Sequence, residues 1–131
     1  MEVLLIDEPF IRIMLDPTSG ILFMLWCGYQ DSHRIETMGI KVIEFIEEHQ
    51  VKKVICDNTN VEGPWFDASI WTRDVWFPAV FEKGVTHFAW VWSEDTFARL
   101  SAERSLPASI PGLKVFNDYN LALKWLEEPP S

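Results

Sequence analysis

The 131-residue sequence lacks the short motifs by which many enzymes are recognised. It has no glycine-rich phosphate loop, no H-E-x-x-H, no G-x-S-x-G and no C-x-x-C. His87 opens an apolar run with no nucleophile paired to it, and the acidic pairs Glu47-Glu48 and Glu127-Glu128 fall at the ends of expected helices, where solvated charge explains them. These absences favour a protein that is not an enzyme and that has no cofactor and no bound metal.

Cysteines are scarce and long apolar runs are missing. Cys27 and Cys56 each lie inside an apolar run, and their spacing fits neither a disulfide framework nor a metal site, so we expect two reduced thiols. The longest apolar run, Ile21 to Cys27, is too short to cross a bilayer. No basic-then-apolar leader is seen, and we therefore expect a cytoplasmic protein without a membrane span.

Positive charge is also in short supply. Eleven Lys and Arg residues stand against twenty Asp and Glu residues, which gives a formal net charge of −9. This balance argues against nucleic acid or an anionic membrane as the main partner. A hydrophobic content of 48% with seven tryptophans excludes a disordered chain, and the length suits one compact domain over residues 1–131.

The apolar patterning predicts strands and helices in a definite order. Two extended pieces separated at Glu8-Pro9 come first, and the second forms a hairpin with Ile21–Trp26 around the turn at residues 16–20. The predicted elements that follow are a helix to about 50, a strand at 51–56, an aromatic helix at 66–83, a strand at 86–92, a helix at 96–104, a strand at 113–116 and a helix at 119–127. We therefore predict an α/β fold with a single-layer mixed sheet of five or six strands. It has an antiparallel N-terminal hairpin, parallel later strands and about four flanking helices.

Several stretches resemble a known superfamily. They are the hairpin ending in Trp26-Cys27-Gly28, the runs VKKVICDNT, WTRDVWFPAVFEKG and FAWVWS, and the ending KVFNDYNLALKWLEE. Together these stretches resemble the STAS superfamily, in particular the SpoIIAA-like domains related to anti-sigma-factor antagonists and to SEC14-type lipid carriers. The resemblance covers nearly the whole chain. It implies a SpoIIAA-like fold and a regulatory or protein-interaction role.

The same resemblance suggests one site of phosphorylation. In phosphorylated members of the superfamily, a serine at the start of the helix after the central strand acts as a switch. Ser69, in the run Asp67-Ala68-Ser69-Ile70, occupies a comparable place, although Ala68 and Ile70 depart from the usual pattern of small hydroxyl residues and a glycine. The alternative is that Ser69 is a small residue in the first turn of the helix, near an Asp67 cap.

Polar residues at the ends of two predicted parallel strands form a candidate ligand site. Asp57, Asn58 and Thr59 follow one strand, and Ser93 follows the next. Because the carboxyl ends of neighbouring parallel strands face one crevice, these side chains are expected to converge there. Each also has a structural explanation, since such residues satisfy loop backbone and cap helices.

The aromatic segment, residues 66–83, is the most unusual stretch of the sequence. Its apolar side chains fall on more than one stripe, whereas a surface helix needs only one, and Pro78 predicts a kink. The excess can be buried within the chain, meet a partner or a second copy, or line a ligand pocket. The candidate interaction residues here are Trp65, Trp71, Trp76, Phe77 and Phe81.

Two functions follow from this excess of aromatic side chains. The leading hypothesis is a non-enzymatic STAS-like regulatory or protein-interaction module, which forms a homodimer or binds a protein partner through residues 66–83. The second hypothesis is a carrier or sensor that binds a small apolar or amphipathic ligand beside that helix.

Overall fold

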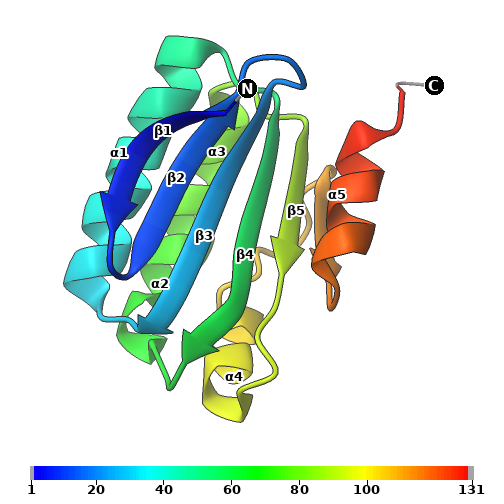
Figure 1. The fold of residues 1–131 in the computed structure, drawn as a ribbon. Coiled ribbons are helices and arrows are strands. Elements are labelled where there is room, and N and C mark those ends of the chain that lie inside the picture. Colours follow the sequence, from blue (N-terminus) through cyan, green and yellow to red (C-terminus); the bar gives the residue numbers. More distant parts are fainter. Residues whose placement is uncertain (1, 130–131) are drawn as a thin grey trace.

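The computed structural model describes residues 2–129 and contains one mixed sheet. Its six strands lie side by side in chain order (Figure 1). They are β1 (Val3–Glu8), β2 (Ile11–Asp16), β3 (Ile21–Tyr29), β4 (Lys53–Glu62), β5 (His87–Val91) and β6 (Leu113–Phe116). Strands β1, β2 and β3 pair antiparallel, and β3 to β6 pair parallel. The predicted α/β mixed sheet is therefore confirmed.

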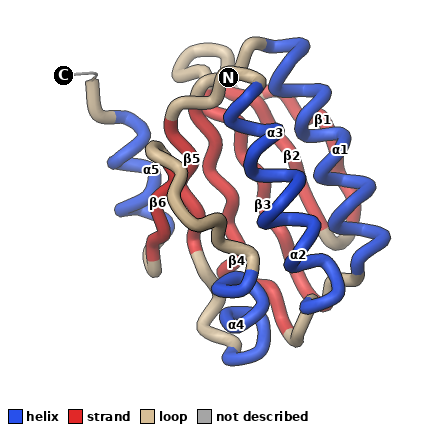
Figure 2. The backbone as a smooth tube through the Cα atoms, turned by 180° about the vertical axis from the view of Figure 1, so that it is seen from behind, coloured by secondary structure: helices blue, strands red, loops and turns tan. Residues whose placement is uncertain are grey.

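Helices cover the two faces of the sheet unequally. Helix α1 (Ser32–His49) and the aromatic segment, with α2 (Ser69–Trp71) and α3 (Phe77–Glu82), lie side by side over one face (Figure 2). Helix α4 (Thr96–Arg104) lies at one end of this layer, while α5 (Tyr119–Glu127) lies on the opposite face (Figure 1). Asp31, Asp95 and Asp118 cap α1, α4 and α5, because each side chain accepts hydrogen bonds from backbone N–H groups of the first turn.

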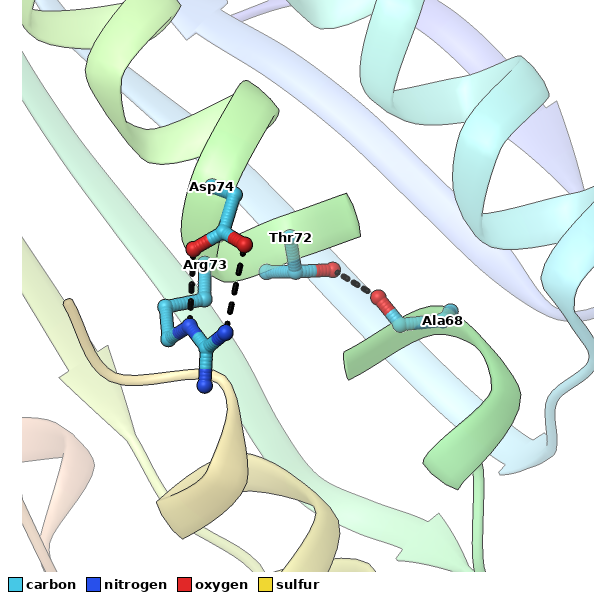
Figure 3. A network of polar contacts seen from close by, with 4 residues as sticks. All are labelled: Ala68, Thr72, Arg73 and Asp74. Carbon is cyan, nitrogen blue, oxygen red and sulfur yellow. Dashed lines mark hydrogen bonds and ion pairs between the residues drawn. The ribbon is translucent and has the colours of Figure 1, made fainter. Parts of the chain in front are cut away.

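The aromatic segment is helical but irregular. Between α2 and α3 the chain makes a π turn, Thr72–Trp76, in which the N–H of Phe77 donates to the carbonyl of Thr72, five residues back. Pro78 has no N–H with which to bond the carbonyl of Asp74, so a regular helix is interrupted here, as predicted. Figure 3 shows the surrounding contacts: Thr72 Oγ1 donates to the carbonyl of Ala68, and Arg73 binds the carboxylate of Asp74 through two nitrogens.

One predicted boundary is wrong. Strand β4 does not end at Cys56 but continues to Glu62, so the polar residues predicted to form a loop belong to a strand. The reason is pairing with the end of β3: Leu25 pairs with Asp57 and Cys27 with Asn60, which leaves Trp26 opposite both Asn58 and Thr59. Two residues opposing one make a β-bulge, and the bulge lets the polar stretch stay in the sheet.

The sheet separates two hydrophobic cores. The larger core lies under α1, the aromatic segment and α4, and contains Met24, Val42, Val54, Phe77 and Phe88 among its most buried residues. The smaller core lies under α5 and is made by Ile21, Phe23, Ile55, Ala89, Val91, Ala122 and Leu126. The larger core contains the features from which a functional site can be built.

Candidate functional site

A pocket of about 50 Å³ lies between the sheet and the layer formed by α1 and the aromatic segment. We call it the aromatic pocket. Its walls come from the ends of β3, β4 and β5, from α1 and from the first half of the aromatic segment. Its lining combines side-chain amides with indole rings, among them Gln30, Asn58, Trp65, Trp71, Trp76 and Trp90.

Edge-to-face and tilted aromatic contacts hold one wall of the pocket. The ring of Phe77 lies 5.1 Å from that of Trp76, 5.2 Å from that of Phe88 and 5.2 Å from that of Trp90, measured between centroids. These separations and tilts are those that aromatic pairs prefer. The π turn sets Trp76 and Phe77 at its end so that both point into the core, where they are 5% and 0% exposed.

Helix α1 closes the opposite wall through Gly39. The indole N–H of Trp76 donates to the carbonyl oxygen of Gly39 at 2.8 Å. This bond satisfies a buried donor and ties the π turn to the middle of α1.

Two polar atoms in the lining have no partner among residues 2–129. They are Nε1 of Trp90, a donor on β5, and Oε1 of Gln30, an acceptor after β3; both atoms are buried. Leaving such a group unpaired costs about 1–3 kcal/mol, so buried polar atoms nearly always bind protein, water or a ligand. The two residues that carry these atoms line one apolar pocket, so a small amphipathic molecule bound there would supply the missing acceptor and donor.

Another polar residue of the lining has a partner within the chain. Asn58, which is 7% exposed, accepts a hydrogen bond from the thiol of Cys56 at 3.5 Å. Burial, followed by the nearby charge of Asp57, raises the pKa of Cys56 far above its ordinary range. The thiol therefore stays protonated and unreactive, and we assign it no nucleophilic role.

The four residues of the predicted strand-end site do not converge. Asn58 lines the pocket, but Asp57 and Thr59 alternate onto the other face of β4, where the Asp57 carboxylate accepts from the N–H and hydroxyl of Thr59. Ser93 is buried and donates to the carbonyl of Val61 at 2.7 Å. The prediction that these residues form a single site is wrong because β4 continues past Cys56.

The structure also contradicts an accessible switch at Ser69. Its side chain is 2% exposed and its hydroxyl donates to the carbonyl of Ser101 at 3.0 Å. A phosphate on Ser69 would need space that the contact between α2 and α4 occupies. The alternative interpretation, in which Ser69 is a small residue of the first turn, agrees with this packing, but the Asp67 cap is wrong, since Ala68 precedes α2 and no side chain of residues 2–129 caps it.

The aromatic side chains mostly face inward. Trp65, Trp76 and Phe77 are at most 5% exposed, so the prediction that they form an interaction surface is wrong for these three. Trp71 and Phe81 are half-buried and pack against the larger core. The large apolar side chains that the segment presents to solvent are Ile70 and Val75, at 58% and 51% exposed.

Sequence reasoning missed Gln30 and Gly39. A glycine in the middle of a helical pattern costs about 1 kcal/mol and usually has a packing reason, so Gly39 carried a usable signal. Gln30 carried none, because its two backbone contacts, to the carbonyls of Cys27 and Gly28, depend on how β3 ends.

The sheet order, the helix layers and the pocket together define an α/β domain with a SpoIIAA-like fold. A solved structure with this fold is similar over nearly its whole length: an uncharacterised protein from the DUF3478 family of Shewanella loihica PV-4, described as SpoIIAA-like. The two chains are 16% identical with a TM-score of 0.51, and the alignment covers 96% of this chain and 92% of the other.

This likeness confirms the predicted fold, and at 16% identity it shows the fold alone. No family model and no curated protein matches the chain. No helix within residues 2–129 is long and apolar enough to cross a membrane.

Proposed function

We propose that the protein is a non-enzymatic STAS-like module that binds a small amphipathic ligand in the aromatic pocket, as a carrier or sensor. This proposal rests on two lining residues of one apolar pocket, Trp90 and Gln30, whose buried atoms Nε1 and Oε1 have no partner among residues 2–129. The fold agrees with the STAS-like part of this proposal, since the similar solved structure is described as SpoIIAA-like.

The pocket limits what this ligand is. Its walls are mainly aromatic rings, so the ligand has an apolar body, with an acceptor for Trp90 and a donor for Gln30. A cavity of roughly 150 Å³ holds benzene and one of roughly 15 Å³ holds a water molecule. At about 50 Å³ the pocket takes a ligand of only a few heavy atoms, unless the half-buried Trp71 moves.

Two buried tryptophans, one in β5 and one just after it, allow a matched test of ligand binding. The Nε1 atoms of Trp90 and Trp92 are both buried and have no partner within residues 2–129, but Trp90 lines the pocket and Trp92 is not among its lining residues. Native mass spectrometry of freshly purified protein should show a bound small molecule that Trp90→Phe loses and Trp92→Phe retains. Retention by both variants would contradict the proposed site. A clean apo mass, with no shift of the Trp90 indole N–H resonance across a library of small amphipathic fragments, would contradict ligand binding.

Self-association through the aromatic segment is a second candidate, and Ile70 and Val75 favour it. These exposed apolar side chains lie on the solvent side of the segment, whereas its Trp76 and Phe77 are buried. If they pair two chains, light scattering after size-exclusion chromatography should show a dimer that Ile70→Ser and Val75→Ser convert to a monomer. A strict monomer at high concentration would rule this candidate out.

A further inference from the structure

The face of the sheet that carries α5 is only half covered. Helix α5 packs on β5, β4 and β6. In Figure 1 no helix of residues 2–129 lies in front of β1, β2 and β3, whereas Figure 2 shows α1 and the aromatic segment side by side over the opposite face. We call the α5 side of β1, β2 and β3 the uncovered face.

Cross-strand neighbours show how exposure changes across this face. Register places five side chains in one row on it, from β1 to β5: Leu4, Met14, Phe23, Ile55 and Ala89. Leu4 is 48% exposed and Met14 is half-buried, whereas Phe23 is 6% exposed and the last two are fully buried. An apolar surface therefore begins where α5 stops covering the sheet.

A second row of cross-strand neighbours, next to the first on the same face, has one apolar residue between two charged residues. In this row Arg12 pairs with Leu25, and Leu25 pairs with Asp57 on β4. Leu25 is half-buried and Arg12 is exposed. The apolar centre of the uncovered face is thus Leu4, Met14 and Leu25, with Asp57 on its α5 side.

Carboxylates border this apolar centre. Asp7 forms an ion pair with Arg12 at 3.4 Å, so the exposed cation of the second row is already neutralised. Burial and then the charges of Asp57, Glu2 and Glu127 raise the pKa of Tyr119, so these acids lie within electrostatic range of the start of α5. Lys53, at the far end of the face, donates to the carbonyl of Leu126.

We propose that the uncovered face docks a basic amphipathic helix of a protein partner. The apolar stripe of that helix packs on Leu4, Met14 and Leu25, and its Lys or Arg side chains reach Asp57, since Asp7 is already paired with Arg12. One added helix beside α5 completes a two-helix layer, as on the opposite face. A second copy is a poor occupant, because each copy carries a net charge of −9 and its carboxylates would repel those of the face.

The site is distinct from the aromatic pocket, which lies on the other side of the sheet. Docking is therefore expected to survive Trp90→Phe, and the two proposals fail independently.

Synthetic peptides of about five helical turns, roughly 18 residues, test the proposal. One is an amphipathic Leu/Lys helix, the second has the same composition in scrambled order, and the third is an amphipathic Leu/Glu helix. Fluorescence anisotropy should show saturable binding of the first peptide and at least roughly tenfold weaker binding of the other two, a difference of about 1.4 kcal/mol. Bound peptide should also slow maleimide labelling of Cys27, which is exposed two residues beyond Leu25.

Matched variants locate the binding. Leu4→Gln and Leu25→Gln should weaken it, while Leu121→Gln, at an outward position of α5 that is 60% exposed, should not. Asp57→Asn should weaken it and Glu94→Gln, an exposed loop residue, should not.

Equal affinity for the scrambled peptide, equal effects of the matched variants or no saturable binding would overturn the proposal. So would a dimer, seen by light scattering, that Leu25→Gln dissociates, since it would assign the face to a second copy.

Discussion

Gly39 and Trp71 lie so close that a methyl group cannot stand between them. A Cβ built on Gly39 would lie 2.9 Å from Cη2 of Trp71 and 2.9 Å from Nε1 of Trp76. Helix α1 therefore contacts the aromatic segment through bare backbone, and this contact allows the hydrogen bond between the Trp76 indole and the Gly39 carbonyl. The same contact forms the α1 wall of the aromatic pocket.

Gly39→Ala should destabilise the protein even though alanine favours helices. The new methyl group forces the indoles of Trp71 and Trp76 to move, and overpacking of this kind costs about 1–3 kcal/mol. Better helix propensity returns about 1 kcal/mol, so we expect a net loss of up to about 2 kcal/mol in the free energy of unfolding. Urea unfolding measures this loss. Ile40→Ala, one residue on and 52% exposed, is the control and should change stability by less than about 0.5 kcal/mol. A gain in stability for Gly39→Ala would contradict the packing described.

Phe77→Ala tests whether the aromatic segment is held by its inward face. Phe77 is fully buried and contacts three other rings, so its truncation should cost about 3–5 kcal/mol. Val75→Ala, two residues earlier on the same turn, removes a side chain that is 51% exposed and should cost under about 0.5 kcal/mol. Both are measured by chemical unfolding. Similar losses for the two variants would mean that the segment does not bury Phe77 as the structure has it.

Local signals in the sequence predicted the later elements well. Asp95 and Asp118 are N-caps whose side chains bond the first turn of the helix that follows, so the predicted starts of α4 and α5 are correct. Strand β6 is also where the apolar pattern placed it. Caps and short periodic runs act within a few residues, and a single sequence contains all the information they need.

Features that depend on distant residues were not predictable in the same way. The polar run after Cys56 reads as a loop, and only its pairing with β3 makes it strand. In the sequence Ser69 resembles a switch residue. In the structure its hydroxyl donates a hydrogen bond to the carbonyl of Ser101, 32 residues later. The apolar pattern of residues 66–83 did not predict which side chains face the core and which face solvent. The direction of each side chain follows from the π turn and from the close approach of Gly39.

Alanine substitutions at Gly112 and Gly28 distinguish the cost of backbone strain from the cost of a steric clash. Both have positive φ, 95° and 81°, but a Cβ on Gly112 would lie 2.2 Å from the carbonyl oxygen of Thr86, whereas one on Gly28 would have nothing within 4 Å. Gly28→Ala should cost about 1–2 kcal/mol for the left-handed backbone alone. Gly112→Ala should cost clearly more, because the start of β6 must also move away from Thr86. Thermal and urea unfolding give both values, and equal losses would show that the contact with Thr86 is not maintained.

Alkaline pH should destabilise the fold through Cys56. Burial raises the pKa of this thiol in the folded protein, whereas in the unfolded chain it titrates near its ordinary value of about 8.5. Above that pH the unfolded chain has lost a proton that the folded protein keeps. The stabilising contribution is therefore complete below about pH 8.5 and falls as pH rises, at up to about 1.4 kcal/mol per pH unit. The raised pKa of Tyr119 acts in the same direction near pH 10.

Replacing the thiol isolates its share of this pH dependence. Urea unfolding from about pH 7 to about pH 10 should show a shallower decline for Cys56→Ala than for the parent protein, even if Cys56→Ala is less stable at neutral pH because of the methyl-sized gap it leaves. Cys27→Ala is the matched control: its thiol is exposed in the folded protein, so the decline should remain. Equal slopes for Cys56→Ala and the parent would show that Cys56 is not held protonated by burial. Tyr119→Phe then tests whether Tyr119 contributes to the decline near pH 10.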